Sequence, residues 1–173
     1  IVLSRHSGKS GILLLAESCH LSLDPRTASR ILGELKNRNL SSLGFTEFLR
    51  LYYKNSGARL LPDTLFDLKD VYGVFENHHF NITIVRTTGD SYCGKGSDMM
   101  AAVFDAAARM SGRRLVSRRS ELRMMDGIYR CYMELFVEWE PPFAVERIGM
   151  EPALLVAQCL IDALNFHLTK EMA

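Results

Sequence analysis

Residues 129–139 read YRCYMELFVEW, and their alternation decides the fold class. Apolar side chains occupy every second position from Tyr129 to Trp139, while Glu134 falls on the opposite face. A period of two is typical of a β-strand that buries one face. The pattern therefore predicts a half-covered strand over residues 129–139, which the Pro-Pro pair at 141–142 ends.

The segments on both sides of this strand extend it into a domain. Asp126 and Gly127 form a dipeptide typical of a two-residue hairpin turn, so residues 115–125 are predicted to be the partner strand. Downstream, a helix is predicted from about residue 151 to 168. Because apolar residues surround most of this helix, we expect it to be buried against a sheet or another subunit.

Helices are predicted in the first third of the chain. Asp24 is a favourable N-cap, and apolar residues such as Ile31 and Leu35 then recur at helical spacing. A shorter apolar helix is predicted at residues 10–18, and a third helix from Phe45 to about residue 57.

Beyond about residue 75 the periodicity changes from 3.6 to 2. Residues 80–85 alternate as a strand, and a glycine-rich corner at 94–97 leads into a helix that ends at Gly112. The sequence therefore predicts an α+β fold, in which a helical subdomain precedes a two-layer α+β domain. The predicted boundaries are 1–60 for the helical subdomain, 61–74 for a linker and 75–173 for the α+β domain.

Composition excludes several classes of protein. The 173 residues are 47% hydrophobic and 24% charged, with 21 Lys and Arg against 20 Asp and Glu, as in ordinary globular proteins. A nucleic-acid-binding domain is usually basic overall, and this chain is nearly neutral. The arginine cluster between Arg113 and Arg123 is therefore interpreted as the edge of a sheet whose positive charges discourage pairing with another strand. We expect no nucleic-acid partner. The longest apolar segment, 153–164, is shorter than a membrane crossing needs, so no membrane span is expected.

The cysteines bear on the cellular compartment of the protein, and the first residue bears on its processing. The four cysteines are far apart and form no C-x-x-C pair, so neither a zinc knuckle nor a dithiol motif is predicted. This usage indicates the cytoplasm or an organelle matrix. The chain starts at Ile1, which we interpret as the start of a processed or truncated chain.

No motif predicts a self-contained active site. Residues 7–10 read SGKS, but Leu3 stands where a phosphate-binding loop requires glycine. The five histidines form no metal-binding pattern, so no metal and no cofactor is predicted in this chain.

Four pieces of the sequence, in order, resemble a known family of enzymes. They are similar to the region that follows the catalytic (β/α)8 barrel in α-isopropylmalate, homocitrate and citramalate synthases. The pieces are Arg5–Leu15 with Ser18–Leu23, Phe45–Tyr53, Gly94–Gly96 with Ala102–Gly112, and Gly149–Asn165.

The resemblance implies a specific role. These enzymes condense acetyl-CoA with a 2-oxo acid on a divalent metal held in the barrel, and the end product inhibits them through a C-terminal regulatory domain. This chain would be the helical subdomain and the regulatory domain of such an acyltransferase of branched-chain amino-acid biosynthesis. Without the barrel and its metal it would not be active alone. A free-standing amino-acid-binding or dimerisation module is the alternative, and a nucleic-acid binder is a third.

The resemblance also implies candidate site residues. His20 and Tyr53 would be catalytic, since an imidazole and a phenol suit proton transfer and thioester polarisation. The alternative is that His20 caps a helix and Tyr53 packs, and Tyr52 competes for its role. The implied effector is a branched-chain amino acid, with leucine as the first candidate. Its predicted site is formed by Gly94, Gly96, Met100, Ala101 and Ala102, where a helix N-terminus suits a carboxylate.

A homodimer is expected on two grounds. The resemblance implies that the regulatory domain dimerises. The final predicted helix is also so apolar that it should leave a patch that a second copy covers.

Overall fold

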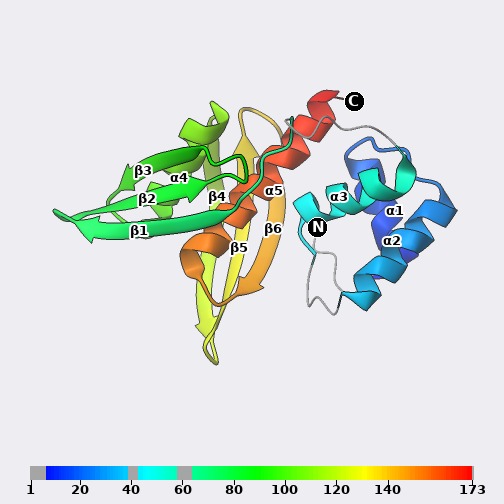
Figure 1. The fold of residues 1–173 in the computed structure, drawn as a ribbon, viewed down its shortest axis with the longest axis horizontal. Helices are drawn as coiled ribbons and strands as arrows, with labels where there is room; N and C mark the ends of the chain where they lie inside the picture. The colour runs from blue at the N-terminus through cyan, green and yellow to red at the C-terminus, as the bar shows by residue number, and fades with distance from the viewer. Residues whose placement is uncertain (1–6, 39–42, 58–63, 173) are drawn as a thin grey trace.

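The computed structural model describes residues 7–38, 43–57 and 64–172 and confirms the α+β fold (Figure 1). Three helices come first, and two three-stranded antiparallel sheets follow. The helices are α1 (Lys9–Ser18), α2 (Pro25–Asn37) and α3 (Phe45–Ser56). Helix α1 packs on α2, α2 on α3, and α3 on the last helix of the chain.

The rest of the chain consists of two successive units with the same element order, three strands and a helix. The first unit is β1 (Asp70–Glu76), β2 (His79–Val85), β3 (Ser91–Gly96) and α4 (Met99–Ser111). The second is β4 (Leu115–Met125), β5 (Ile128–Val137), β6 (Phe143–Gly149) and α5 (Pro152–Met172). Within each sheet the strands are ordered as in the sequence.

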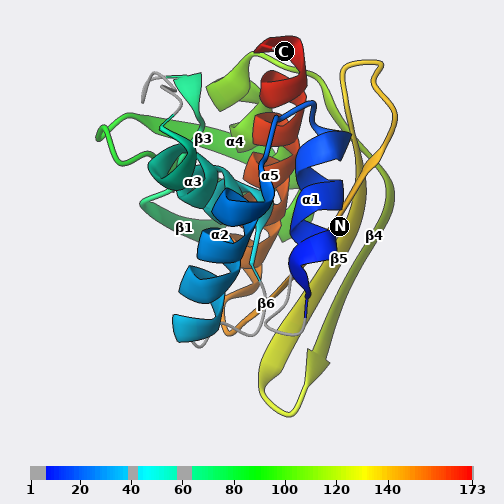
Figure 2. The same cartoon turned by 90° about the vertical axis from the view of Figure 1, so that its right-hand side faces the viewer.

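Local chemistry explains where several elements begin and turn. The Asp24 carboxylate accepts hydrogen bonds from the amides of Arg26 at 2.8 Å and Thr27 at 3.1 Å, which caps α2 as predicted. Asp126 and Gly127 have φ angles of 53° and 77°, and such positive values suit the hairpin that joins β4 to β5. This hairpin extends beyond the rest of its sheet (Figure 2).

The alternation in residues 129–139 is confirmed over most of its length. Cys131, Met133, Leu135 and Val137 are buried on one face of β5, which packs against α5. Trp139 is the exception, because β5 ends at Val137 and the indole is 85% exposed. Glu138, with a φ of 55°, turns the chain before this position, so the assignment of Trp139 to the buried face is wrong.

Three strands are absent from the predicted element order. The expected linker, 61–74, contains the start of β1 at Asp70. The expected glycine corner is part of β3, and β6 follows the Pro-Pro pair where a loop was expected. These strands are short and broken by glycine or charge, so their alternation is weak.

Helix α5 is the central element of the fold. It contacts β5 and β6 of its own unit, and also β1, α3 and α4 (Figure 1). By length and composition it could cross a membrane, yet 67% of its most apolar window is buried inside this protein. Because the chain itself covers α5, the apolar character of this helix no longer argues for a dimer.

Candidate functional site

His20 lies in the turn that follows α1. Its amide donates to the carbonyl of Glu17 at 3.0 Å, and its φ of 58° is left-handed. The side chain is exposed and borders an open surface hollow of about 510 Å³ that Leu13, Glu17 and Ser22 also line. The imidazole therefore faces solvent in this chain, where a second domain or a substrate can reach it.

Tyr53 lies on α3, close to the same turn. Burial raises the pKa of its phenol, and the neighbouring Tyr52 and Cys19 add to the increase. Its ring meets the Tyr52 ring edge-on at 5.0 Å. The Tyr52 hydroxyl donates to the carbonyl of Ser22 at 2.9 Å, whereas the Tyr53 hydroxyl makes no hydrogen bond within the part of the chain that the structure describes. Of the two phenols, Tyr53 is thus the one with an available hydroxyl.

Gly94 and Gly96 lie in β3, so the predicted glycine loop is wrong. An added Cβ at Gly94 would stand 2.2 Å from the backbone oxygen of Ala102 and 2.2 Å from the backbone nitrogen of Ala106. At Gly96 it would stand 2.5 Å from the Ala102 nitrogen. The glycines are required because α4 lies directly on the strand, and Ala102 is fully buried there.

The start of α4 already satisfies its own amides. The Asp98 carboxylate accepts from the Ala101 amide at 2.8 Å, and the Asp98 carbonyl accepts from the Ala102 amide. Ala101 is exposed and Met100 is half-buried. An effector carboxylate would have to displace the Asp98 side chain, so the effector role of these residues stays a prediction.

A buried polar cluster that no sequence pattern predicted joins the helical subdomain to the second unit. Asp162 on α5 is completely buried and accepts from Arg147 Nε at 2.8 Å and Nη2 at 2.9 Å. The amide and hydroxyl of Thr46, at the start of α3, donate to the same carboxylate at 2.9 and 2.8 Å. Glu47 accepts from Arg147 at 2.9 Å. We call Thr46, Glu47, Arg147 and Asp162 the α3 clamp.

The α3 clamp holds opposite charges away from water. Burial raises the pKa of Asp162, while the Arg147 guanidinium and the Thr46 donors oppose this increase. Burial also acts against the charge of Arg147, but Asp162 and Glu47 outweigh it and raise the pKa of the guanidinium. Gly44 makes room for Arg147, since a Cβ at this glycine would overlap the guanidinium. Such a satisfied ion pair suits attachment rather than proton transfer.

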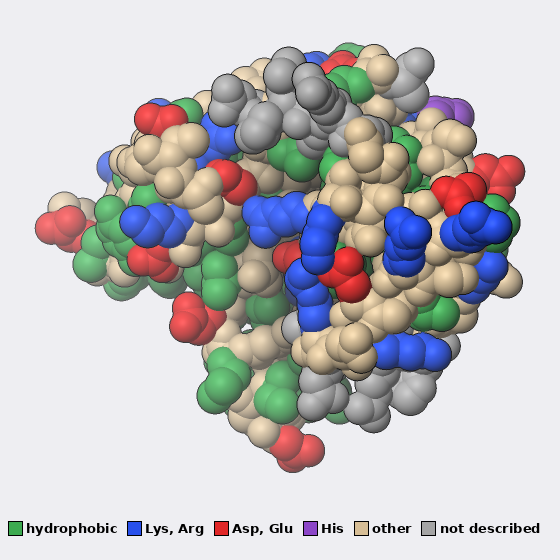
Figure 3. Space-filling model, turned by 45° about the vertical axis from the view of Figure 1, so that its right-hand side comes forward, with side chains coloured by type: hydrophobic (Ala, Val, Ile, Leu, Met, Phe, Trp, Pro, Cys, Tyr) green, Lys and Arg blue, Asp and Glu red, His purple; other side chains and the backbone are tan. Residues whose placement is uncertain are grey.

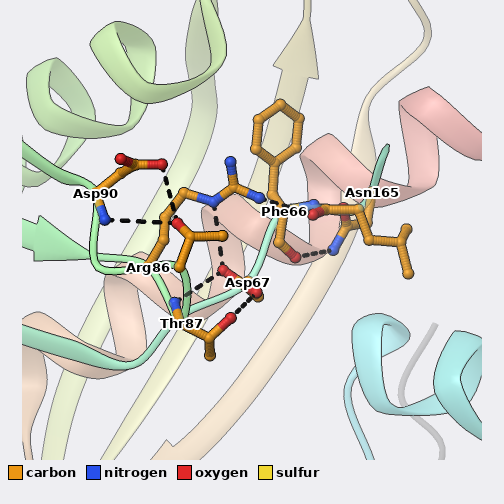
Figure 4. A network of polar contacts seen from close by, with 8 residues as sticks. Phe66, Asp67, Arg86, Thr87, Asp90 and Asn165 are labelled. Atoms are coloured by element: carbon orange, nitrogen blue, oxygen red, sulfur yellow. Dashed lines mark hydrogen bonds and ion pairs between the residues drawn. The ribbon is translucent and has the colours of Figure 1, made fainter. Parts of the chain in front are cut away.

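Asn165, one turn after Asp162, attaches the segment that leads to β1. Its amide group donates to the Phe66 carbonyl at 2.9 Å and accepts from the Phe66 amide at 2.8 Å (Figure 4). It also donates to the Thr46 hydroxyl at 3.0 Å. The signal for both attachments was present in the sequence, because Asp162 and Asn165 are polar residues in an apolar helix and buried polar groups require partners.

A second polar network in Figure 4 holds the turn between β2 and β3. The Asp67 carboxylate accepts from Arg86 Nε at 3.3 Å and from the Thr87 amide at 3.2 Å. Burial works to raise the pKa of Asp67, but the hydrogen bonds from Thr87 and the charge of Arg86 outweigh it and lower the pKa. Arg86 also donates to the carbonyl of Leu65 at 3.1 Å.

The predicted arginine cluster is accompanied by acidic residues. Glu121 pairs with both Arg119 and Arg123, and Arg118 lies 3.6 Å from Glu134. Basic and acidic side chains are also interspersed on the face shown in Figure 3. Within the described ranges, no group of three His, Cys, Asp or Glu side chains is placed to hold a metal ion.

No family model matches the chain, and no curated protein matches its sequence.

Proposed function

We propose that this chain is the helical subdomain and the regulatory domain of an α-isopropylmalate synthase-like acyltransferase, which works as a homodimer in the cytoplasm or an organelle matrix. In the intact enzyme a barrel with a divalent metal would condense acetyl-CoA with a 2-oxo acid. This chain would contribute His20 and Tyr53 to that reaction and would respond to an amino-acid effector, with leucine as the first candidate.

The observation that supports a regulatory role is the α3 clamp. A regulatory domain changes activity only if the effector favours one arrangement and a physical contact transmits that arrangement to the catalytic part. Thr46 and Glu47 belong to the helix that carries Tyr53, while Arg147 and Asp162 belong to the second α+β unit. The clamp therefore supplies a direct connection between the two parts.

The catalytic part of the proposal is tested in the longest natural polypeptide that contains this chain. His20→Ala should lower kcat for acetyl-CoA condensation about 100-fold or more, the usual contribution of a general acid or base. It should leave the melting temperature almost unchanged, because the side chain is exposed. His79→Ala, at an exposed position on β2, is the matched control. Equal activity of the His20 variant and the control would exclude a catalytic role.

Tyr53 is tested in the same assay with a matched neighbour. Tyr53→Phe removes the available hydroxyl and should lower kcat, whereas Tyr52→Phe removes the bond to the Ser22 carbonyl and should mainly lower stability. The reverse result would assign the catalytic phenol to Tyr52.

The regulatory part is tested by calorimetry with leucine, isoleucine, valine and lysine at millimolar concentration. We expect heat from one of them, and Ala101→Trp should abolish it, since Ala101 is the exposed alanine at the predicted site. Ala102→Trp is unsuitable because Ala102 is buried against β3. Absence of heat from all four would contradict effector binding.

The alternative function is a free-standing amino-acid-binding or dimerisation module. The amides at the start of α4 already donate to Asp98, which favours the dimerisation module over the amino-acid-binding module. In that case the fold serves assembly without an effector. The coding sequence upstream of Ile1 separates the alternatives. Barrel motifs there support the enzyme, and a start codon immediately upstream supports the module.

A further inference from the structure

His167, near the end of α5, is a buried side chain that the function proposed above does not use. The residue is only 7% exposed, and neither ring nitrogen makes a hydrogen bond in the described structure. Its Nε2 lies 3.2 Å from a carboxylate oxygen of Glu171, one turn farther along, without hydrogen-bond alignment. Buried polar groups almost always have partners, so an unsatisfied imidazole points to a group that belongs beside it.

The imidazole lines a hollow of about 100 Å³ between the end of α4, the end of α5 and the segment before β1. Two of its lining side chains, Arg113 and Glu171, are partly exposed, at 36% and 41%. Ser111 contributes a hydroxyl that also accepts from the Arg113 amide at 3.2 Å and so holds the start of this segment in place. The complete lining is Thr64, Phe66, Ser111, Arg113, Leu164, His167, Leu168 and Glu171.

Glu171 shows which chemistry the hollow accepts. Its two carboxylate oxygens receive hydrogen bonds from Arg113 Nη1 at 3.1 Å and Nη2 at 2.8 Å. This is the two-pronged arrangement in which a guanidinium recognises any carboxylate. Glu171 reaches the arginine from the exposed last turn of α5, so a carboxylate from solution can take its place without disturbing the core.

We propose that this hollow binds a small carboxylic acid of two or three carbons, with Arg113 and His167 as its donors and Glu171 as the internal group that it replaces. The hollow is small, at about 100 Å³, and an acid of this size suits it. The bound carboxylate accepts hydrogen bonds from Nη1 and Nη2 of Arg113 in place of Glu171, whose side chain moves into solvent. The His167 imidazole then gains the hydrogen-bond partner that it lacks. This site is separate from His20 and from the start of α4, and it does not depend on the proposed function.

The experiment follows the His167 ring signals by NMR while the chain is titrated with acetate, pyruvate or inorganic phosphate. His167→Gln assigns the signals. We expect saturable shifts with acetate and pyruvate, and weaker binding of phosphate at the same ionic strength. Glu171→Gln should tighten carboxylate binding about tenfold or more, because an internal competitor that occupies Arg113 nine-tenths of the time weakens binding by that factor.

Two further variants make the test decisive. Arg113→Lys keeps the charge but loses the two-pronged contact, so it should weaken binding. Arg109→Lys should change nothing, because Arg109 forms an exposed pair with Asp105 within α4. Glu171→Ala repeats the competitor test if the glutamine variant is unstable. The proposal is overturned if carboxylates leave the His167 signals unmoved in wild type and in both Glu171 variants. It is also overturned if phosphate binds equally well, or if removing Glu171 fails to tighten binding.

Discussion

Helices α4 and α5 occupy the same place in two units of the same element order, yet they are buried in different ways. Helix α4 buries five of its 13 residues, mostly alanine, and lies so close to β3 that the strand requires glycine beneath it. Helix α5 buries 12 of its 21 residues, including Asp162 and Asn165, and contacts elements from all parts of the chain. Close apolar contact therefore stabilises one unit, whereas α5 adds buried polar attachments.

Asp162→Ala should have the largest effect on stability. Removing one partner of a buried ion pair costs about 3–5 kcal/mol, because it leaves Arg147 charged and buried. Urea unfolding measures the loss. Arg147→Met combined with Asp162→Leu should recover much of it, since apolar residues can replace a buried pair. A loss below about 1 kcal/mol in the single variant would mean that α5 is held by its apolar contacts alone.

Gly94→Ala tests the close contact of α4. The new methyl group would overlap three backbone atoms of the helix, so we expect a loss of about 1–3 kcal/mol, the usual result of overpacking. Gly33→Ala is the matched control, because this glycine is exposed in α2 with nothing within 4 Å of an added Cβ. It should stabilise the protein by about 0.5–1 kcal/mol. Equal effects of the two substitutions would contradict the packing described for β3.

Asn165→Ala tests the local attachment of the segment before β1. It removes hydrogen bonds to both backbone groups of Phe66, so we expect a loss of about 1–2 kcal/mol. The Phe66 amide should also exchange its hydrogen faster than in wild type. Asn81→Ala, at a half-buried position of β2, should change stability by about 0.5 kcal/mol or less. Unchanged exchange at Phe66 would show that this segment is held by other contacts.

The smallest expected effect concerns Asp67 and pH. Its pKa is lower in the folded protein than in the unfolded chain, so the ionised form stabilises the fold. This contribution is complete above the ordinary pKa of aspartate, near 4, and is lost as the pH falls through the lowered value. The stability difference between wild type and Asp67→Asn should therefore shrink as the pH falls from about 5 to 2. A constant difference over this range would contradict the assignment.

The elements that sequence predicted best are those with a long, uninterrupted period. The alternation of Met133 and Leu135 in β5, the cap at Asp24 and the hairpin at Asp126 all depend on residues adjacent in the chain. The glycines of β3 led to the prediction of a loop, which is wrong. Glycine is required there because α4 packs directly on the strand. No local pattern carries that information.

The candidate site shows the same limit. His20 and Tyr53 were selected by resemblance, and the structure adds that Tyr53 has the available hydroxyl while Tyr52 is bound to Ser22. The α3 clamp was not predicted, because Thr46 and Asp162 are 116 residues apart and only the folded chain brings them together.

The position of α5 in the element order has a consequence for synthesis on the ribosome. Its partners β1, β5, β6, α3 and α4 all precede it in the sequence, so they emerge first and wait with their apolar faces uncovered. Chains that expose such surfaces aggregate readily, and domains complete their folding only when the last required element has emerged. A chaperone therefore has to cover these faces of the nascent chain until α5 has emerged.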